Sequence, residues 1–247
     1  MISTDYREKI KEFWIKGLKL KKVNGIKTYI KISKDIGENT CQIMFFKDFR
    51  ILTIPAGIEE IPVQLRKAVS QSFDEKKLDE TIKNIEEKRY IMYLSPEAYK
   101  LIEVEGAELK KLSESDRTAF NDLKARTSEK DNETSFVEMD HPVVFGCLFD
   151  NKLVAVSSNL NWGEYIADIG ILTDSNYRKK GFGKATVNAL CAWNIEQGKI
   201  NQYRCEAENV NSFRIARNLG FELTALVYRF KTEVAKNTVE KNKRRDG

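Results

Sequence analysis

The stretch Arg178-Lys-Lys-Gly-Phe-Gly-Lys-Ala185 (RKKGFGKA) joins an apolar segment, residues 165–173, to a helix-like segment over residues 182–197. Its two glycines let the main chain adopt positive φ and let a ligand approach without meeting a Cβ. A helix that begins at this point leaves its first N–H groups without partners, and the positive end of its dipole lies beside four basic residues. The stretch therefore predicts an anion-binding turn, although a tight strand-to-helix turn with surface lysines would give the same pattern.

Spacing separates this turn from the best-known phosphate-binding motifs. A P-loop needs a glycine five residues before its Gly-Lys-Ser/Thr, whereas Arg178 and Ala185 occupy the two deciding positions here. A dinucleotide-binding fingerprint needs a third glycine where Thr186 stands, and its strand opens a βαβ unit. The spacing therefore excludes a P-loop and gives a Rossmann site little support.

The residues on both sides of the turn predict alternating strands and helices. From residue 107 the expected order is strand, helix, three strands, helix, strand, helix, strand. Residues 127–134 are expected to form a polar loop, and Asp150-Asn151 predicts a hairpin. The last helix is framed by Asn209 as N-cap and by Gly220 just after its end.

The first hundred residues predict a separate, mixed α/β region without a chemical motif. An amphipathic helix over residues 6–20 precedes the turn signal Asn24-Gly25, and strand-like and helical segments follow. The pattern changes near Gly106, which predicts an N-terminal domain, a second domain and a basic tail over residues 1–105, 106–235 and 236–247. The charges at the end of the tail are more typical of a solvated terminus than of a nucleic-acid-binding arm.

Composition and charge restrict the class of protein. The 247 residues are 41% hydrophobic and 32% charged, which suits a globular core, and they contain no apolar run long enough to cross a membrane. The charged N-terminus lacks the apolar stretch of a signal peptide, so we expect a cytoplasmic protein without a membrane partner. The net charge of +5 favours an anionic small ligand or serves solubility, and the interleaved acidic and basic residues predict no nucleic-acid partner.

The cysteine and histidine content argues against metal sites and nucleophilic triads. Cys41, Cys147, Cys191 and Cys205 lie far apart without a CxxC pair, so we expect reduced and mostly buried thiols. His141 is the only histidine, and no GxSxG motif accompanies it. We therefore expect neither a bound metal nor a Ser–His–Asp triad.

The glycine turn and the later helix together resemble the GNAT N-acetyltransferase superfamily. Residues 178–183 fit its Q/R-x-x-G-x-G/A loop, and Asn209-x-x-Ser212 followed by Leu219-Gly220-Phe221 fits its later helix. The resemblance covers residues 107–232 and implies an α/β (α+β) fold, in which a mixed, mostly antiparallel central sheet has flanking helices and a splayed strand pair. A smaller mixed α/β domain would precede this fold.

The resemblance also implies an activity and a set of binding residues. Acetyl-CoA would be the co-substrate, and a small-molecule or peptide amine would attack its thioester directly, without a metal or a covalent enzyme intermediate. The main chain of Ile171, Leu172 and Thr173 would bind the pantetheine arm, with Asn209 and Ser212 on its far side. The residues implied around the diphosphate are Arg178, Lys179, Lys180, Gly181, Phe182, Gly183 and Lys184.

The sequence leaves the proton-transfer groups open. Many family members carry a tyrosine seven residues after the asparagine, where this chain has Ala216; the remaining candidates for the acid are Tyr203, Tyr228, a serine and water. The candidate general bases are Asp168, Glu206 and Glu164. Each of these carboxylates could equally be a solvated or salt-bridged surface acid. A base can also act through water, so none of the three need be essential.

The favoured function is an N-acetyltransferase that acts on a primary amine. Ala216 keeps open a non-catalytic acyl-CoA-binding or sensor domain, and the glycine turn alone would also suit a protein that binds a nucleotide phosphate. Residues 1–105 are expected either to recognise the acceptor or to form a homodimer.

Overall fold

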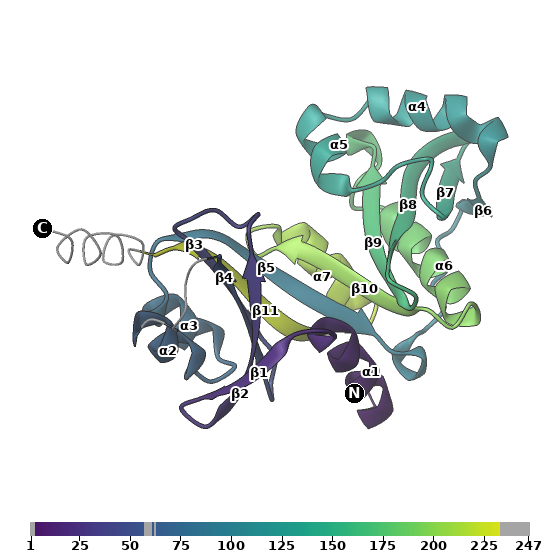
Figure 1. Ribbon diagram of the computed structural model, residues 1–247. Coiled ribbons are helices and arrows are strands. Elements are labelled where there is room, and N and C mark those ends of the chain that lie inside the picture. Colours follow the sequence, from purple (N-terminus) through teal and green to yellow (C-terminus); the bar gives the residue numbers. More distant parts are fainter. Residues whose placement is uncertain (1–2, 57–60, 62, 233–247) are drawn as a thin grey trace, which may run out of the picture. The chain divides into compact units, whose positions relative to one another are not determined.

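The computed structural model describes residues 3–56, 61 and 63–232 (Figure 1). The predicted basic tail, residues 236–247, and residues 233–235 of the predicted second domain lie outside the described residues. The chain forms two compact units. The glycine-loop unit contains residues 1–3, 92–204 and 209–222, and the amino-terminal unit contains residues 4–91, 205–208 and 223–247.

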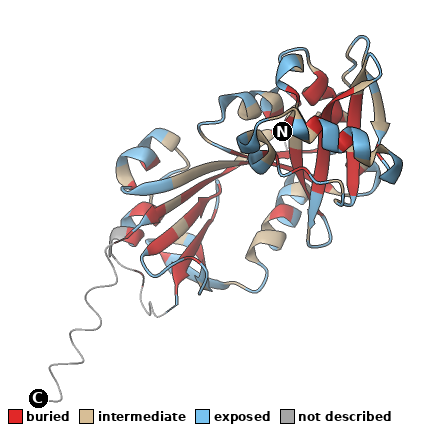
Figure 2. Ribbon diagram, turned by 90° about the horizontal axis from the view of Figure 1, so that it is seen from above, coloured by how far each residue is buried: buried red, intermediate tan, exposed pale blue. Residues whose placement is uncertain are grey.

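A mixed sheet with helices on it forms the amino-terminal unit. Its elements are α1 (Thr4–Ile15), β1 (Lys19–Val23), β2 (Ile26–Ser33), β3 (Thr40–Phe45), β4 (Arg50–Pro55), α2 (Val63–Val69), α3 (Glu75–Thr81), most of β5 (Ile85–Leu94) and most of β11 (Glu222–Lys231). The order β1-β2-β4-β3-β11 has one parallel pair, β2 with β4, among antiparallel ones. Figure 2 shows how the buried residues follow these strands.

One local prediction changes at the start of this unit. The helix α1 ends at Ile15 instead of residue 20, because Lys19–Val23 forms a strand that pairs with β2. Asn24 and Gly25 have φ values of 50° and 80°, as the two central residues of a type I′ hairpin require. The turn signal was therefore right, but the segment before it is a strand.

The strand β11 belongs mostly to the amino-terminal unit, whereas the sequence placed it in the second domain. It runs antiparallel to β3, with Leu226 paired to Phe45 and Lys231 to Thr40. Leu226, Tyr228 and Phe230 are buried in the same core as the apolar residues of β3, β4 and α2. The compact units are thus not consecutive segments, because the end of the chain completes the core that the beginning starts.

A second arrangement of strands, in the order β10-β9-β8-β7-β6, forms the glycine-loop unit. Its elements are η1 (Pro96–Ala98), β6 (Glu108–Lys111), η2 (Glu114–Asp116), α4 (Arg117–Ala125), α5 (Glu129–Ser135), β7 (Val143–Phe149), β8 (Lys152–Trp162), β9 (Ile166–Thr173), η3 (Ser175–Tyr177), α6 (Phe182–Glu196), most of β10 (Ile200–Glu206) and α7 (Val210–Asn218). The predicted element order is confirmed, with one additional helix. Within the described residues, no helix is both long enough and apolar enough to cross a membrane.

The additional helix is α5, which lies where the sequence predicted a polar loop. Ser128 caps it, because the Ser128 side chain accepts a hydrogen bond from the Asp131 amide. Ser135 is its only buried residue among those described, so the segment has no apolar stripe from which a helix could be predicted. Gly170 lies directly beneath the end of this helix: a Cβ at residue 170 would be 2.4 Å from the Ser135 carbonyl oxygen.

The pairing of β9 with its two neighbours leaves part of one edge free. On one side β9 pairs with β8 along its whole length, from Ile166 with Trp162 to Thr173 with Ala155. On the other side the parallel pairing with β10 ends at Ile169 with Tyr203, although both strands continue. Residues 170–173 therefore have an unpaired edge toward β10, which is the splayed pair that the sequence predicted.

Candidate functional site

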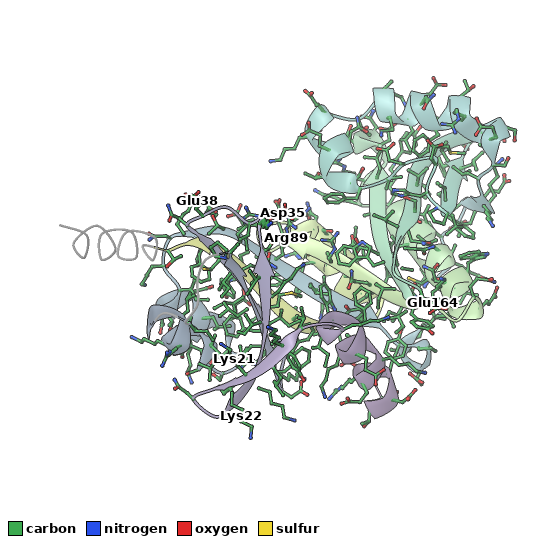
Figure 3. All side chains as sticks on the ribbon, in the orientation of Figure 1. Lys21, Lys22, Asp35, Glu38, Arg89 and Glu164 are labelled. Atoms are coloured by element: carbon green, nitrogen blue, oxygen red, sulfur yellow. The ribbon has the colours of Figure 1, made fainter. Side chains whose placement is uncertain are left out.

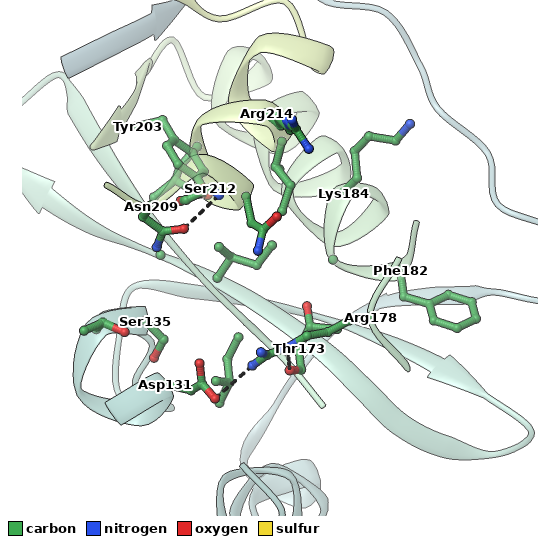
Figure 4. A pocket seen from close by; sticks show the side chains of 18 of the residues that line it. Asp131, Ser135, Thr173, Arg178, Phe182, Lys184, Tyr203, Asn209, Ser212 and Arg214 are labelled. Atoms are coloured by element: carbon green, nitrogen blue, oxygen red, sulfur yellow. Dashed lines mark hydrogen bonds and ion pairs between the residues drawn. The ribbon is translucent and has the colours of Figure 1, made fainter. Parts of the chain in front are cut away.

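A pocket of about 570 Å³ opens where β9 and β10 diverge (Figure 4). Among its lining residues are most of those predicted to bind the co-substrate: Ile171, Leu172, Thr173, Arg178, Lys179, Gly181, Phe182, Gly183, Lys184, Asn209 and Ser212. The structure thus brings the end of β9, the glycine turn and the start of α7 to one place. Lys180 does not line the pocket, and its ammonium lies 5.2 Å from the centre of the Tyr177 ring.

The glycine turn presents main-chain amides to this pocket. Gly181 is the N-cap of α6 with φ of 92°, and Lys179 before it also has a positive φ, 65°. The first intrahelical bond runs from the Ala185 amide to the Gly181 carbonyl, so the amides of residues 182–184 have no partner inside the helix. The turn therefore has the geometry of an anion site at a helix N-terminus.

Gly183 is required for the close approach of α6 to β9. A Cβ at this position would lie 2.5 Å from Thr173 Oγ1 and 2.9 Å from Ile171 Cδ1. These contacts are shorter than any side chain tolerates without movement of its neighbours. The glycine thus places the helix N-terminus against the free edge of β9.

Buried contacts behind the turn hold it in place. Asp174 is fully buried, its amide donates to the Val154 carbonyl, and its carboxylate lies 3.0 Å from Arg126 Nε. The ring of Phe182 is also buried and packs against Phe149, with the two ring centres 5.0 Å apart. The main chain of Phe182 faces the pocket while its side chain anchors the turn to the core.

The charge of the pocket is predominantly positive. Lys179, Lys184 and Arg214 line it, and among the described residues none of the three has an ion pair. Arg178 pairs with Asp131 at 2.9 Å and does not contribute a free cation (Figure 4). A hydrogen bond from Ser128, helped by Arg178, holds the pKa of Asp131 below its usual range. Asp131 is therefore a charged carboxylate whose Oδ2 is engaged by Ser128 and Arg178.

The helix α7 supplies the opposite wall. Asn209 is its N-cap, as predicted: its Oδ1 accepts from the Ser212 amide at 3.0 Å. The Ser212 hydroxyl in turn lies 2.8 Å from the Tyr203 hydroxyl of β10, and both residues line the pocket. Ala216, at the position of the family tyrosine, is fully buried.

The tyrosine candidates for the acid are separated by the structure. Tyr203 lies at the pocket, whereas Tyr228 lies in the amino-terminal unit, where its hydroxyl donates to Asp79 at 2.7 Å. Burial, reinforced by Asp79, raises the pKa of Tyr228 far above its usual value. Among the tyrosines that the sequence left open, Tyr203 is the one placed at the site.

None of the three candidate bases lines the pocket. Asp168 is buried and held by Arg204, whose Nη2 lies 2.6 Å away, and by Gln202 Nε2 at 2.9 Å. Glu206 belongs to the amino-terminal unit, and Glu164 lies in the exposed turn between β8 and β9 (Figure 3). The carboxylate that does line it, Asp131, was missed because its helix was expected to be a loop.

Sequence reasoning also missed the pocket-facing side of α7 and the end of α5. Asn211, Arg214, Ile215 and Asn218 line the pocket at helical spacing, a signal that was available once Asn209 was taken as the N-cap. Phe136 and Arg204 had no such signal, because they are 68 positions apart and meet only in the folded chain.

The described residues contain no cluster of metal ligands and no exposed thiol. In residues 3–56, 61 and 63–232, no three His, Cys, Asp or Glu side chains come together as metal ligands. The four cysteines form no disulfide and are buried, as the sequence predicted. Burial raises the pKa of Cys41 and Cys147 to about 11, so both stay protonated near neutral pH.

Comparison with solved structures finds many matches. An acetyltransferase of the GNAT family from Novosphingobium aromaticivorans is 16% identical with a TM-score of 0.48, over 60% of this chain and 65% of that one. A GNAT-family acetyltransferase from Colwellia psychrerythraea is 18% identical with a TM-score of 0.47, over 66% and 63%. A GCN5-related N-acetyltransferase-like protein from Streptococcus suis is 14% identical with a TM-score of 0.43, over 87% and 82%.

The first two alignments span less than two thirds of those relatives' lengths. No curated protein matches the chain. A protein-family model, described as GNAT acetyltransferase, matches residues 58–228. This match begins well before residue 107, so the family pattern extends into the N-terminal region that the resemblance left out. Since the model covers more than half of the chain, the protein belongs to the GNAT acetyltransferase family.

Proposed function

We infer that the protein transfers an acetyl group from acetyl-CoA to a primary amine, by direct attack of the amine on the thioester. The observation that carries this proposal is the free edge of β9 beside a helix N-terminus that lacks side-chain caps. A strand edge suits the amide-containing pantetheine arm, and the N-terminus of α6 suits a diphosphate. Only glycine fits at residue 183 of the turn, because a Cβ there would collide with side chains of β9.

The pocket's charge supports the same ligand. Lys179, Lys184 and Arg214 are free to pair with phosphate groups, while Arg178 is already paired with Asp131. When bound, acetyl-CoA supplies an activated carbonyl carbon and a thiolate leaving group. The chain's own work is to bind and orient that thioester through the amides of residues 182–184 and the edge of residues 170–173.

Proton movement is assigned to groups that the pocket contains. The Tyr203 hydroxyl lines the pocket and is hydrogen-bonded to Ser212, and it would donate a proton to the departing thiolate. For the incoming ammonium, the pocket offers no disengaged carboxylate among its described lining residues, since Asp131 is held by Ser128 and Arg178. The proton therefore leaves to water.

A ligand titration tests the proposal. Acetyl-CoA should raise the Tm, and at a concentration of one hundred times Kd the stabilisation is about 2.7 kcal/mol. NAD and ATP at the same concentration should have little effect. Stabilisation by ATP or NAD without stabilisation by acetyl-CoA would contradict the proposal, and binding without CoA release across a broad amine panel would favour the sensor function.

A matched pair of glycine variants locates the binding site. Gly183→Ala should weaken acetyl-CoA binding about tenfold, because its methyl group displaces Thr173 and Ile171 on the edge of β9. Gly198→Ala is the control: residue 198 has φ of 68° and open space around its Cβ, so it costs about 1 kcal/mol of stability and leaves binding unchanged. Equal affinity of both variants, measured by calorimetry, would show that the ligand lies elsewhere.

A further inference from the structure

The pocket has a second group of lining residues that acetyl-CoA binding does not use. Ser135 and Phe136 at the end of α5 and Arg204 on β10 line it. We call this group the α5 end of the pocket. It lies over one face of β9, because the Ser135 and Phe136 carbonyl oxygens occupy the space into which a Cβ at residue 170 would project.

Phe136 is held in an unfavourable state at this place. Its side chain is 63% exposed although it is large and apolar, and its φ of 52° is a conformation that bulky residues rarely adopt. The carbonyl of Phe136 would lie only 2.6 Å from a Cβ at residue 170, so its backbone is fixed against β9. Strained residues of this kind occur mostly at binding and catalytic sites.

Arg204 lies beside Phe136 and has donors to spare. Its guanidinium carbon is 4.3 Å from the centre of the Trp162 ring and 5.9 Å from that of Phe136. Asp168 accepts hydrogen bonds from Nε and Nη2, which fixes the plane of the guanidinium. Among the described residues Nη1 has no hydrogen-bond partner, and the side chain keeps 21% of its surface exposed. Two aromatic rings and one carboxylate thus hold an arginine whose Nη1 keeps its donors unused among the described residues.

The charges of the lining residues restrict what can bind at the α5 end. Asp131 is the one carboxylate among the described lining residues, and it already pairs with Arg178. A polycationic acceptor would therefore find no free negative partner and would lie near Lys179, Lys184 and Arg214. A carboxylate, in contrast, matches the planar donors of an arginine.

We propose that the α5 end binds the acceptor, and that this acceptor is an amine carrying a carboxylate and an aromatic or branched apolar side chain. The proposal rests on the acetyl transfer inferred above. The carboxylate accepts hydrogen bonds from Arg204, the apolar group covers the ring of Phe136, and Asp168 acts as a positioning residue for Arg204. In the transfer, the amine nitrogen bonds to the acetyl carbon as the carbon–sulfur bond breaks. The ammonium loses two protons: one goes to water, and the other replaces the proton that the Tyr203 hydroxyl gives to the thiolate.

A panel of three amines tests the acceptor class, with acetyl-CoA saturating and free thiol as the readout. L-Phenylalanine should be acetylated with a kcat/KM about tenfold above that of L-phenylalaninamide, because the amide lacks the carboxylate. Since the amide has the less basic amine, it contains more free nucleophile at neutral pH, and the chemistry alone would favour it. Spermidine should be the poorest substrate. Equal or faster turnover of the amide or of spermidine would overturn the proposal.

Variants separate recognition from folding. Phe136→Gly should raise the KM for L-phenylalanine about tenfold while the Tm stays equal or rises, because glycine adopts a φ of 52° without strain. Arg204→Lys keeps a cation beside Asp168 but loses the planar donors, so the preference for the acid over the amide should fall toward one. Leu101→Ala is the control, since Leu101 is 72% exposed and does not line the pocket. An unchanged preference in Arg204→Lys would overturn the role of Arg204.

The outcomes distinguish the acceptor proposal from the proposed acetyl transfer on which it rests. If acetyl-CoA fails to stabilise the protein, the acetyl transfer itself is wrong. If acetyl-CoA stabilises it and thiol release follows spermidine or the amide, the transfer stands and the acceptor assignment is wrong. Stabilisation by acetyl-CoA without thiol release from L-phenylalanine also overturns the acceptor assignment.

Discussion

At the scale of single residues, we propose that Tyr203 acts as the proton donor in place of the tyrosine that this site lacks. Ala216 occupies the position where many relatives carry a tyrosine, and it is fully buried. The hydroxyl of Tyr203 reaches the pocket from β10 and is hydrogen-bonded to Ser212 on α7. A proton donor has to lie within reach of the leaving group, and a hydroxyl from either element would meet that need.

Tyr203→Phe tests this substitution of roles. We expect kcat to fall about a hundredfold with little change in the KM for acetyl-CoA, because the hydroxyl acts on the leaving group and not on binding. Steady-state thiol release measures both parameters. Tyr228→Phe is the control: it loses a buried hydrogen bond to Asp79, so it should lower stability by about 1 kcal/mol and leave kcat unchanged. A Tyr203→Phe enzyme with wild-type kcat would assign the proton to Ser212 or water.

At the scale of elements, the glycine turn depends on the segment that leads into it. Asp174 ends β9, caps the short helix η3 through the Asn176 amide, and pairs with Arg126 from the end of α4. Burial alone would raise its pKa, but Arg126 and the Asn176 amide outweigh that effect, and the pKa lies below its usual 3.8. The carboxylate is thus ionised in the folded protein and fixes where the turn begins.

Asp174→Asn should lower the free energy of unfolding at pH 7 by about 2 kcal/mol, because it removes a buried, charge-assisted contact. A lowered pKa contributes stability above the unfolded value of 3.8, and this contribution is lost as the pH falls through the folded pKa. The difference between wild type and variant should therefore shrink below pH 3.8. Urea denaturation at several pH values measures it. The exposed pair of Asp140 with Arg117 supplies the control, since Asp140→Asn should have no measurable effect. A difference that is constant with pH would contradict the assigned cause.

At the scale of the whole molecule, each of the two compact units is built from segments that are not consecutive in the sequence. The amino-terminal unit takes residues 205–208 and 223–247 from the far end of the sequence. The strand β11 adds Leu226, Tyr228 and Phe230 to the core that β3, β4 and α2 begin. The core of the amino-terminal unit thus includes side chains from β11, residues 222–231, as well as from the first part of the chain.

Deletion of residues 223–247 should abolish cooperative unfolding of the amino-terminal unit. The loss of Leu226, Tyr228 and Phe230 from this core, at about 2–5 kcal/mol each, is comparable with the whole stability of a domain. Circular dichroism melting and size-exclusion chromatography measure the result, and we expect aggregation. The matched control lacks only residues 236–247, the tail that the sequence predicts to be solvated. A monomeric deletion variant with a wild-type melting curve would contradict the role of β11.

Much of the fold could be predicted because its signals are short-range. The hairpin at Asp150-Asn151, where φ is 49° and 56°, and the N-cap at Asn209 each depend on two to four residues in sequence. The prediction failed at α5, whose polar residues carry no apolar periodicity, and at residues 19–23, where strand pairing displaced the end of a helix. The candidate bases lie outside the lining of the pocket for another reason: the exposure and partners of a carboxylate cannot be read from the sequence.

By itself the sequence determined the glycine turn, the order of the elements around it and the capped helix α7, because each follows from backbone preferences within a few residues. Only the tertiary structure decided that β11 joins β3, that Asp168 is occupied by Arg204, and that Phe136 meets Arg204 at the pocket. These contacts join residues from 36 to 191 positions apart. Their partners are chosen by the packing of the whole sheet, which no local pattern contains.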